Sequence, residues 1–332
     1  MDLTLTDASW HDVGLVVPSG GDFAWGADEN DFSIGLDGDV LPELGALLYC
    51  EGTDVGGMVT GYESDSGSGT LTVVGDTWTG VMGRKVLGPD RGSAYWSVSG
   101  DARDCVAALV SRLDLDGLFD VDGRKTGVEV RHTFSGTTDA AQGSTGRYMS
   151  GWAALWQLLV GNGLKVRLRW DAAARRVRVE VLRRSDWTDA EAVGVGVASM
   201  RVSRRTPTNH LVCLGSGELA DREVVDLYAD RAGNVSTSQS LNGIDEVAEV
   251  YEDSSKSGDE LSADGAKRLR RLWADSQTVR VSALSSVSLD LGDVIGGTDA
   301  RTGVSATAVV TKKVARLDGG ALSYEYESTV RS

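Results

Sequence analysis

Cysteine and proline are scarce in this chain, and each scarcity excludes a class of protein. Cys50, Cys105 and Cys213 are odd in number, lie far apart and show no paired spacing. They predict neither a disulfide framework nor a zinc site, and we expect them to be reduced and buried. Only 4 prolines accompany 42 glycines. That ratio is typical of many strands joined by tight turns and excludes a proline-rich linker.

Long hydrophobic runs are lacking as well. No apolar run approaches the roughly 18 residues that a membrane span needs. The chain does not open with the charged and then apolar segments of a signal peptide. We therefore expect a protein that folds in the cytoplasm of its host and does not insert into a membrane.

Positive charge is in deficit, with 33 Lys and Arg against 49 Asp and Glu and a net charge of −16. The densest basic stretches, Arg167–Arg184 and Lys267–Arg271, indicate an alternating strand and the outer face of a helix. Nucleic-acid binding needs clustered basic residues that release counterions from phosphates, so specific DNA binding is not expected. A passage lined with carboxylates would instead repel phosphates and let DNA slide through.

Motifs for cofactor binding appear only as near misses. Gly117–Thr126 resembles a phosphate-binding loop, but it has one residue too many, and Arg124 stands where Lys should follow the glycine. The acidic segment Asp114–Gly123 resembles a calcium loop, yet Lys125 occupies the twelfth position, where Glu is required. A solvated acidic turn explains that segment, and a loose ion site stays an alternative.

Catalytic constellations are not recognisable either. The histidines, His11, His132 and His210, are isolated, and no Gly-x-Ser-x-Gly turn occurs. Nine tryptophans are compatible with a sugar-stacking platform, although Trp152 and Trp156 on one predicted helix face favour core packing. We therefore predict no catalytic residue, no cofactor and no metal, in a protein that is not an enzyme.

Hydrophobic periodicity gives a coarse plan of strands around a mixed centre. Alternation with small-residue turns predicts strands in the first hundred residues, and a short helix is expected over Thr77–Gly83. Apolar spacing of three and four predicts helices over Val106–Leu113, capped by Asp101, and over Tyr148–Leu159. An antiparallel hairpin with one solvated face follows over residues 165–181. The last third predicts the strands Ser199–Ser203, His210–Leu214, Glu223–Tyr228, Ala248–Tyr251, Val279–Ala283, Gly303–Val314 and Ala321–Glu325, one helix near Leu261–Asp275, and a mobile loop Glu252–Glu260.

A chain of 332 residues is long enough for two or three domains. We predict a mainly β fold with an α+β insertion. Residues 1–98 would form an N-terminal β-barrel-like domain; in an alternative interpretation, strands from beyond residue 190 complete it. Residues 99–190 would form the α+β insertion, and residues 191–332 a second β-barrel-like domain that carries the one helix.

Several patches, in this order and spacing, resemble the tail-hub or minor tail proteins of siphoviruses that infect actinobacteria. The patches are Leu3–Thr6, Asn30–Ile34, Leu71–Asp76, Leu291–Gly296, Val310–Val314 and Gly320–Tyr326. They span most of the chain, and each alone is only a strand with a turn. The motif residues are Asp31, Phe32, Gly75, Arg84, Pro89, Gly292 and Asp293. Gly292 would permit a positive φ in a turn that enters a strand, and Arg84 could pair within a subunit or across subunits.

The resemblance implies a baseplate-hub fold of two β-barrel-like domains joined by α+β insertions. It implies a homotrimeric ring at the tail tip of the virion that surrounds the DNA passage. The partners would be the distal tail protein ring, tail fibre or tip proteins and the tape measure protein. Such hubs often carry a C-terminal fibre or lytic extension, and none follows the closing strand here, so we expect separate tip proteins.

Two other functions stay open at the level of sequence. The tryptophans and carboxylates are compatible with a carbohydrate-binding or carbohydrate-cleaving module that recognises the host surface. The same fold could also serve as the hub of a contractile injection system.

Overall fold

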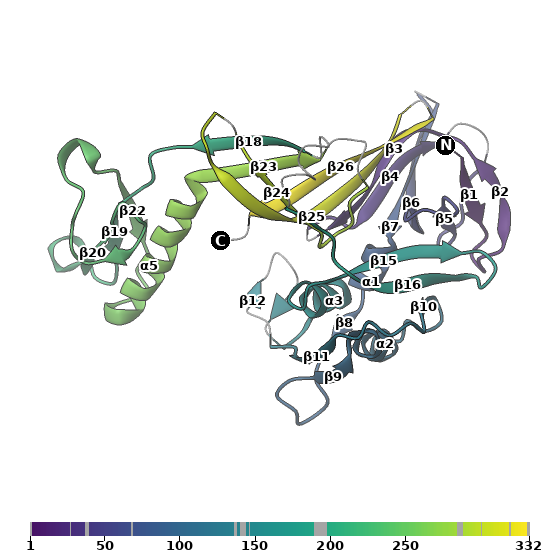
Figure 1. The fold of residues 1–332 in the computed structure, drawn as a ribbon, viewed down its shortest axis with the longest axis horizontal. Coiled ribbons are helices and arrows are strands. Elements are labelled where there is room, and N and C mark those ends of the chain that lie inside the picture. Colours follow the sequence, from purple (N-terminus) through teal and green to yellow (C-terminus); the bar gives the residue numbers. More distant parts are fainter. Residues whose placement is uncertain are drawn as a thin grey trace. The chain divides into compact units, whose positions relative to one another are not determined.

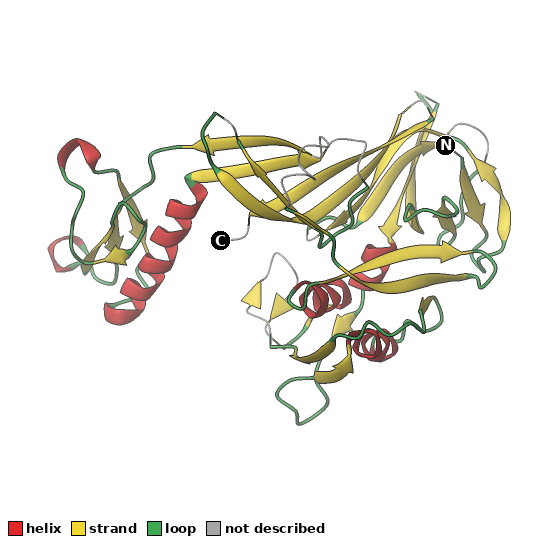
Figure 2. Cartoon of the chain, in the orientation of Figure 1, coloured by secondary structure: helices red, strands yellow, loops and turns green. Residues whose placement is uncertain are grey.

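The computed structural model describes residues 2–26, 28–36, 40–67, 69–135, 138–139, 144–145, 147–188, 198–283, 288–299, 301–318 and 320–330 (Figure 1). Among the described residues, more lie in strands than in helices, and strands dominate the cartoon in Figure 2. The predicted mainly β class is therefore confirmed.

The chain divides into two compact units. Unit 1 comprises Met1–Ser199, Val281–Gly297 and Ser305–Ser332, and unit 2 comprises Met200–Arg280 and Thr298–Val304. The predicted borders at 98/99 and 190/191 stay a prediction, and the second of them lies outside the described residues.

An eleven-stranded sheet forms the body of unit 1, in the order β17-β24-β25-β3-β4-β7-β6-β5-β1-β2, with β26 paired to β25. β25 pairs antiparallel with β3, so strands from the end of the chain complete a sheet that starts at its beginning. The strands are β1 (Leu3–Thr6), β2 (Asp12–Val16), β3 (Pro18–Gly26), β4 (Asp31–Leu36), β5 (Leu47–Tyr49), β6 (Gly56–Asp65), β7 (Thr70–Thr77), β17 (Asp186–Trp187), β24 (Val294–Thr298), β25 (Ser305–Asp318) and β26 (Ala321–Val330).

Alternation along β4 shows why this sheet forms. Phe32, Ile34 and Leu36 are buried on one face, as their spacing predicts. Phe32 lies opposite Phe23 of β3 with ring centroids 4.8 Å apart. Ile34 lies opposite Val73 of β7, so the inner face of neighbouring strands is continuously apolar.

A mixed α/β segment lies between β7 and β17 within unit 1. β10 and β15 flank β16 in a three-stranded sheet, and two-strand pairs join β9 with β11, β8 with β14 and β12 with β13. The elements are α1 (Trp78–Gly83), β8 (Val86–Leu87), β9 (Ser97–Asp101), α2 (Ala102–Arg112), β10 (Phe119–Val121), β11 (Glu129–Thr133), β12 (Thr138–Asp139), β13 (Ser144–Thr145), β14 (Met149–Ser150), α3 (Gly151–Val160), β15 (Leu164–Asp171) and β16 (Arg176–Arg183).

The helices of this segment confirm the periodicity argument. Asp101 caps α2 by accepting a hydrogen bond from the Arg103 amide, and Ser150 caps α3 through the Ala153 amide. α3 starts at Gly151, so Tyr148 precedes the helix rather than opening it. A β-carbon on Gly151 would lie 2.6 Å from the Met82 carbonyl oxygen, which shows how closely α1 and α3 pack.

Unit 2 contains a four-stranded sheet, in the order β21-β20-β19-β22, on which α5 packs. Its core is Leu211, Cys213, Leu227, Ala229, Leu261 and Leu269. The elements are β18 (Ala198–Arg204), β19 (His210–Leu214), η2 (Leu219–Asp221), β20 (Val224–Ala229), β21 (Val235–Ser236), η3 (Gly243–Asp245), β22 (Ala248–Glu252), α5 (Gly258–Asp275) and β23 (Gln277–Ala283), which pairs with β18.

Two features differ from the expected second lobe. We expected the strands over 191–332 to form one lobe, but they belong to different sheets. β24, β25 and β26 lie in the large sheet of unit 1, whereas β19 to β22 form the sheet of unit 2. α5 begins at Gly258, inside the segment 252–260 that the sequence predicts as a loop, and the Glu223 carboxylate accepts a hydrogen bond from the Gly258 amide at this end. In the described residues, no helix is both long and apolar enough to cross a membrane.

Candidate functional site

Three of the seven motif residues, Asp31, Phe32 and Gly75, lie on two neighbouring strands. Phe32 on β4 pairs with Gly75 on β7, and Asp31 pairs with Asp76. A β-carbon on Gly75 would lie 2.3 Å from both the Met58 carbonyl oxygen and the Phe32 ring. Gly75 is therefore required by close approach of its neighbours and not by a turn.

Arg84 joins this group from the end of α1. It forms a salt bridge with Asp76, and its guanidinium also lies 3.7 Å from the Met58 sulfur. The Arg84 pair seen here is therefore within one chain, between a helix end and a strand. Both side chains are partly exposed, so the pair orients groups at the surface more than it stabilises the fold.

A cavity of about 340 Å³ opens beside these residues, and we call it the acidic pocket. Its walls include Asp28, Asp31, Asp76, Trp152 and Trp156. Partial burial raises the pKa of Asp31 above its usual value, and the negative charges of Glu29 and Asp76 add to the effect. Three carboxylates and the Arg84 guanidinium therefore line the pocket next to an aromatic wall.

Gly292 and Asp293 lie in a second place, at a buried ion cluster. The Lys165 Nζ lies 2.8 Å and 3.0 Å from the two carboxylate oxygens of Asp293 and 2.8 Å from an oxygen of Asp290. Arg167 reaches the same oxygen of Asp290 at 2.8 Å. The sequence predicts a solvated polar face for the β15–β16 hairpin, and the burial of Lys165 in this cluster corrects that expectation.

Backbone groups complete the cluster. Asp293 accepts hydrogen bonds from the amides of Ser185 and Asp290, at 2.7 Å and 2.9 Å. Gly292, with a φ of +91°, turns the chain between the two aspartates. Burial alone would raise the pKa of Asp290, but hydrogen bonds and charge from Lys165 and Arg167 outweigh it and hold the pKa below its usual value.

A second, partly buried ion pair lies near this cluster. Lys313 on β25 pairs with Asp54, and Tyr324 donates a hydrogen bond to the same carboxylate at 3.3 Å. Burial, with the Asp54 charge, raises the pKa of Tyr324, which therefore stays protonated. A small cavity of about 30 Å³, bounded by Asp54, Arg167, Asp290 and Lys313, separates the two ion pairs and is large enough for a water molecule. These charges connect strands β15 and β25 to turns that are distant in sequence.

Pro89 lies apart from both groups, in the wall of an open pocket of about 720 Å³. Trp96 in the same wall has the Arg112 guanidinium 5.0 Å from its ring centroid and the Phe134 ring stacked at 5.0 Å. Two neighbours thus already contact the ring of Trp96. Sugar stacking needs an open aromatic face, so this arrangement does not favour a sugar platform at Trp96.

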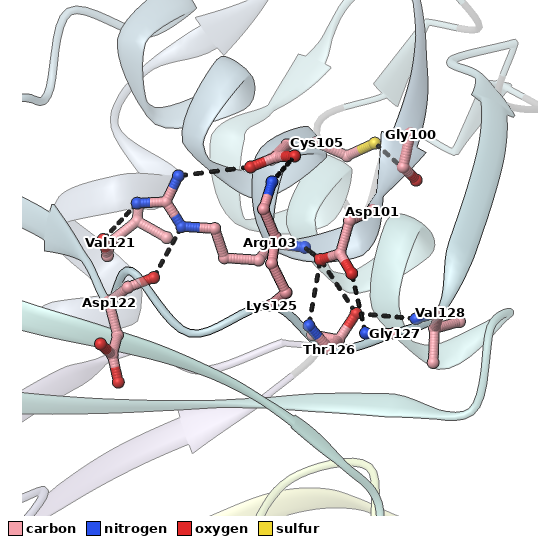
Figure 3. Close-up of polar contacts among 11 residues, drawn as sticks. Gly100, Asp101, Arg103, Cys105, Val121, Asp122, Lys125, Thr126, Gly127 and Val128 are labelled. Carbon is pink, nitrogen blue, oxygen red and sulfur yellow. Dashed lines mark hydrogen bonds and ion pairs between the residues drawn. The ribbon is translucent and has the colours of Figure 1, made fainter.

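The segment that resembles a phosphate-binding loop has a structural role (Figure 3). Asp101 accepts hydrogen bonds from the amides of Thr126 and Gly127 and from the Thr126 hydroxyl, in addition to capping α2. These amide hydrogen bonds outweigh the effect of burial and hold the pKa of Asp101 below its usual value. Two amides at the end of this segment are therefore bound to a carboxylate of the protein.

The neighbouring charges of this segment are engaged as well. Arg103 donates to the carbonyl oxygens of Val121 and Asp122 at 2.7 Å and 2.6 Å, and Lys125 pairs with Asp104 (Figure 3). Among the described residues, no group of three or more His, Cys, Asp or Glu side chains is arranged to hold a metal ion. The ion-site alternative for Asp114–Gly123 gains no support from this geometry.

Comparison with known proteins gives a likeness in structure only. No protein-family model and no curated protein sequence matches the chain. It is similar to a chain in the activated baseplate of phage p2, with 10% identity, a TM-score of 0.49 and 98% of each chain covered. It is also similar to prophage tail protein gp18 from Listeria monocytogenes, with 10% identity, a TM-score of 0.47, and 100% and 96% covered.

A third similar structure is the 43 kDa tail protein of prophage MuSo2 from Shewanella oneidensis, with 12% identity and a TM-score of 0.46. The alignment covers 99% of this chain and 98% of that one. Identities and TM-scores at this level establish neither a family nor a function for the chain.

Several residues of these sites have no local signal in the sequence. Lys165 and Asp293 are 128 positions apart, and Lys313 and Asp54 are 259 apart. His210 is also held, between Glu246 and Asp226 at 2.5 Å and 2.9 Å, with its ring stacked on Tyr228. Only pairing the strands correctly would have brought these partners together.

Proposed function

We propose that this chain is a virion structural protein, a subunit of a tail-tip hub that forms a homotrimeric ring around the DNA passage of a siphovirus of actinobacteria. The proposal also holds that the chain is not an enzyme. Its partners are the distal tail protein ring, tail fibre or tip proteins and the tape measure protein. The protein assembles in the host cytoplasm and resides at the tail tip of the virion.

One observation carries most of the proposal. The lysines buried in unit 1 connect strands to turns that are distant in sequence, as Lys165 does with Asp290 and Asp293 and as Lys313 does with Asp54. A catalytic carboxylate or lysine must keep a polar atom within hydrogen-bond reach of the substrate. Groups that are committed to each other in this way suit a rigid scaffold, and the ordered sequence patches agree with a tail hub.

The charge of the chain suits a passage for DNA. A net charge of −16 repels phosphates, so DNA would move past the ring without specific binding. A basic channel wall in an assembled ring would contradict this part of the proposal.

The mass of the purified chain tests the ring directly. Light scattering is expected to give three times 35.1 kDa, and negative-stain images should show rings with a central hole. A single-chain mass at every concentration would contradict the homotrimer.

The carbohydrate alternative and the secretion alternative need separate measurements. On the hub proposal, a glycan array and a reducing-sugar assay should give no signal. Trp25, Trp78, Trp152 and Trp170 are buried in the core and offer no face to a sugar. Binding or cleavage above background would favour the host-recognition module. Recovery of the chain from a contractile injection particle would favour the hub of a contractile injection system.

A further inference from the structure

The C-terminal half of the outer surface of α5 is basic, whereas its first turn carries the exposed acids Asp259 and Glu260. Leu261, Gly265 and Leu269 face the core of unit 2. The opposite side carries Lys267, Arg270 and Arg271, which are exposed. Arg205, also exposed, adjoins the end of this helix, because its amide donates to the Ser276 carbonyl at 2.9 Å. We call these four residues the α5 basic surface.

Most of this charge has no counterpart in the same chain. Arg271 lies 3.9 Å from Asp275, with a side chain that is 85% exposed. Within the described part of the chain, Lys267, Arg270 and Arg205 form no salt bridge. The negative end of the helix dipole favours basic residues in the last turn. It does not explain Lys267, two turns before the end, or Arg205, which comes from another segment.

The acidic pocket of unit 1 contains carboxylates that lack a cationic partner. Asp76 is paired with Arg84, and Glu29 with Lys312. Over the described residues, neither Asp28 nor Asp31 forms a salt bridge or a side-chain hydrogen bond. The half-buried Trp156 ring stands in the wall of the same cavity. A basic side chain that entered would find an aromatic ring and two carboxylates that form no salt bridge. It would also lie beside Arg84, which is paired with Asp76, and near Lys312, whose charge already acts on Asp31.

From these two surfaces we infer that the α5 basic surface of one copy docks into the acidic pocket of a second copy. Because the two surfaces are different, the contact is heterologous, and repetition of such a contact closes a ring when the rotation allows it. The inference rests on the proposed homotrimer and names the residues that hold it together. A guanidinium or ammonium group suits a cavity of about 340 Å³ lined by carboxylates and tryptophan.

The pKa of Asp31 supports this assignment. It is raised in the single chain by partial burial and by neighbouring negative charge. A basic side chain from a second copy would reverse that effect and lower the pKa. The Asp31 carboxylate should therefore titrate at lower pH in the assembled ring than in a dissociated chain, as carboxylate-detected NMR can measure.

Charge reversal on the full chain tests the contact. K267E/R271E should weaken self-association by at least about tenfold in light scattering, because attraction between the surfaces becomes repulsion. D28K/D31K should do the same from the other side. The quadruple variant K267E/R271E/D28K/D31K restores complementarity and should recover the trimer mass. R231E, on a loop of unit 2 with an 82% exposed side chain, makes a charge reversal outside the surface and should leave the mass unchanged.

The outcomes separate this inference from the proposed function. A trimeric wild type that K267E/R271E leaves trimeric overturns the docking contact and retains the hub. A quadruple variant that folds, by circular dichroism, but stays a single chain overturns it too. A monomeric wild type overturns both the contact and the homotrimer, and the presence of the chain in virions then decides its structural role.

Nucleic acid is the other ligand that a basic surface could bind. A fluorescent DNA duplex should show no saturable binding to the wild type at 150 mM salt, about physiological ionic strength. Binding that K267E/R271E abolishes, with the mass unchanged, would assign the surface to DNA and overturn the docking contact. Raising the salt to about 500 mM should dissociate the wild-type ring, because exposed charges are then screened.

Discussion

Lys165 and Asp293 form a salt bridge in the interior of unit 1, with side chains only 6% and 1% exposed. The pair connects β15 of the α/β segment to the turn that leads into β24. Buried charges are costly unless each is fully paired, and here backbone amides and Asp290 complete the partners. The cluster therefore specifies how the α/β segment meets the large sheet.

Removing one partner of this cluster should be strongly destabilising. Lys165→Met leaves Asp290 and Asp293 buried without their shared cation, so the free energy of unfolding should fall by about 3–5 kcal/mol. Urea denaturation followed by tryptophan fluorescence measures the loss. Lys125→Met, which removes a 59% exposed partner of Asp104, is the matched control and should cost less than about 1 kcal/mol. Equal losses would contradict a special role for the cluster.

Acid should weaken the fold through Asp290. Its pKa is lowered in the folded chain, so its contribution is present above the unfolded-state value of about 3.9 and is lost as pH falls through the folded value. The urea midpoint of the wild type should therefore drop below about pH 4. Asp290→Asn should be less stable at pH 7 and should show a shallower acid dependence. A parallel acid dependence in the two proteins would refute this linkage.

Gly75 should tolerate no side chain. In Gly75→Ala the new methyl group meets the Met58 carbonyl and the Phe32 ring, so the cost should be about 1–3 kcal/mol of overpacking. Gly14→Ala on the edge strand β2 has no atom within 4 Å of the new carbon and should be nearly neutral. Thermal melts of both variants provide the comparison, and a stable Gly75→Ala would show that β4 and β7 can separate.

Asp101 should matter more than a helix cap alone. Asp101→Ala removes the α2 cap and leaves the Thr126 and Gly127 amides without their acceptor, so the loss should exceed the ~1 kcal/mol that is typical of a cap. Hydrogen exchange should report faster exchange at those two amides. The nearby Asp104→Ala should leave their exchange unchanged, since Asp104 does not accept from them. Protected amides in Asp101→Ala would rule out this role.

Local patterns were sufficient for much of the fold. The helices α1, α2, α3 and α5 and the strands β4, β7, β15 and β16 follow from apolar spacing and flanking turns, because the apolar side chains of each face the core of its own unit. β2 and β3 could not be predicted in the same way. The region between Asp12 and Gly26 is rich in glycine and contains Pro18, so alternation is weak. β3 forms a strand because β4 and β25 pair with its two edges.

The site residues show the same limit. The sequence motif identifies Gly75, but it does not explain why a glycine is needed there. The explanation is the close contact with Phe32 and Met58, which is evident only when the three strands are paired. Lys165 lies on an alternating strand whose other cations face solvent more openly, so its burial had no sequence signal. Its partners come from 125 and 128 positions away, and charge patterns near one strand cannot identify them.

The presence of the chain in the virion tests the central claim most directly. Peptide mass spectrometry of purified virions, with isolated tails as a second sample, should detect this chain among the tail proteins at a few copies per particle. Complete, infectious virions that contain no peptide of this chain would contradict the account.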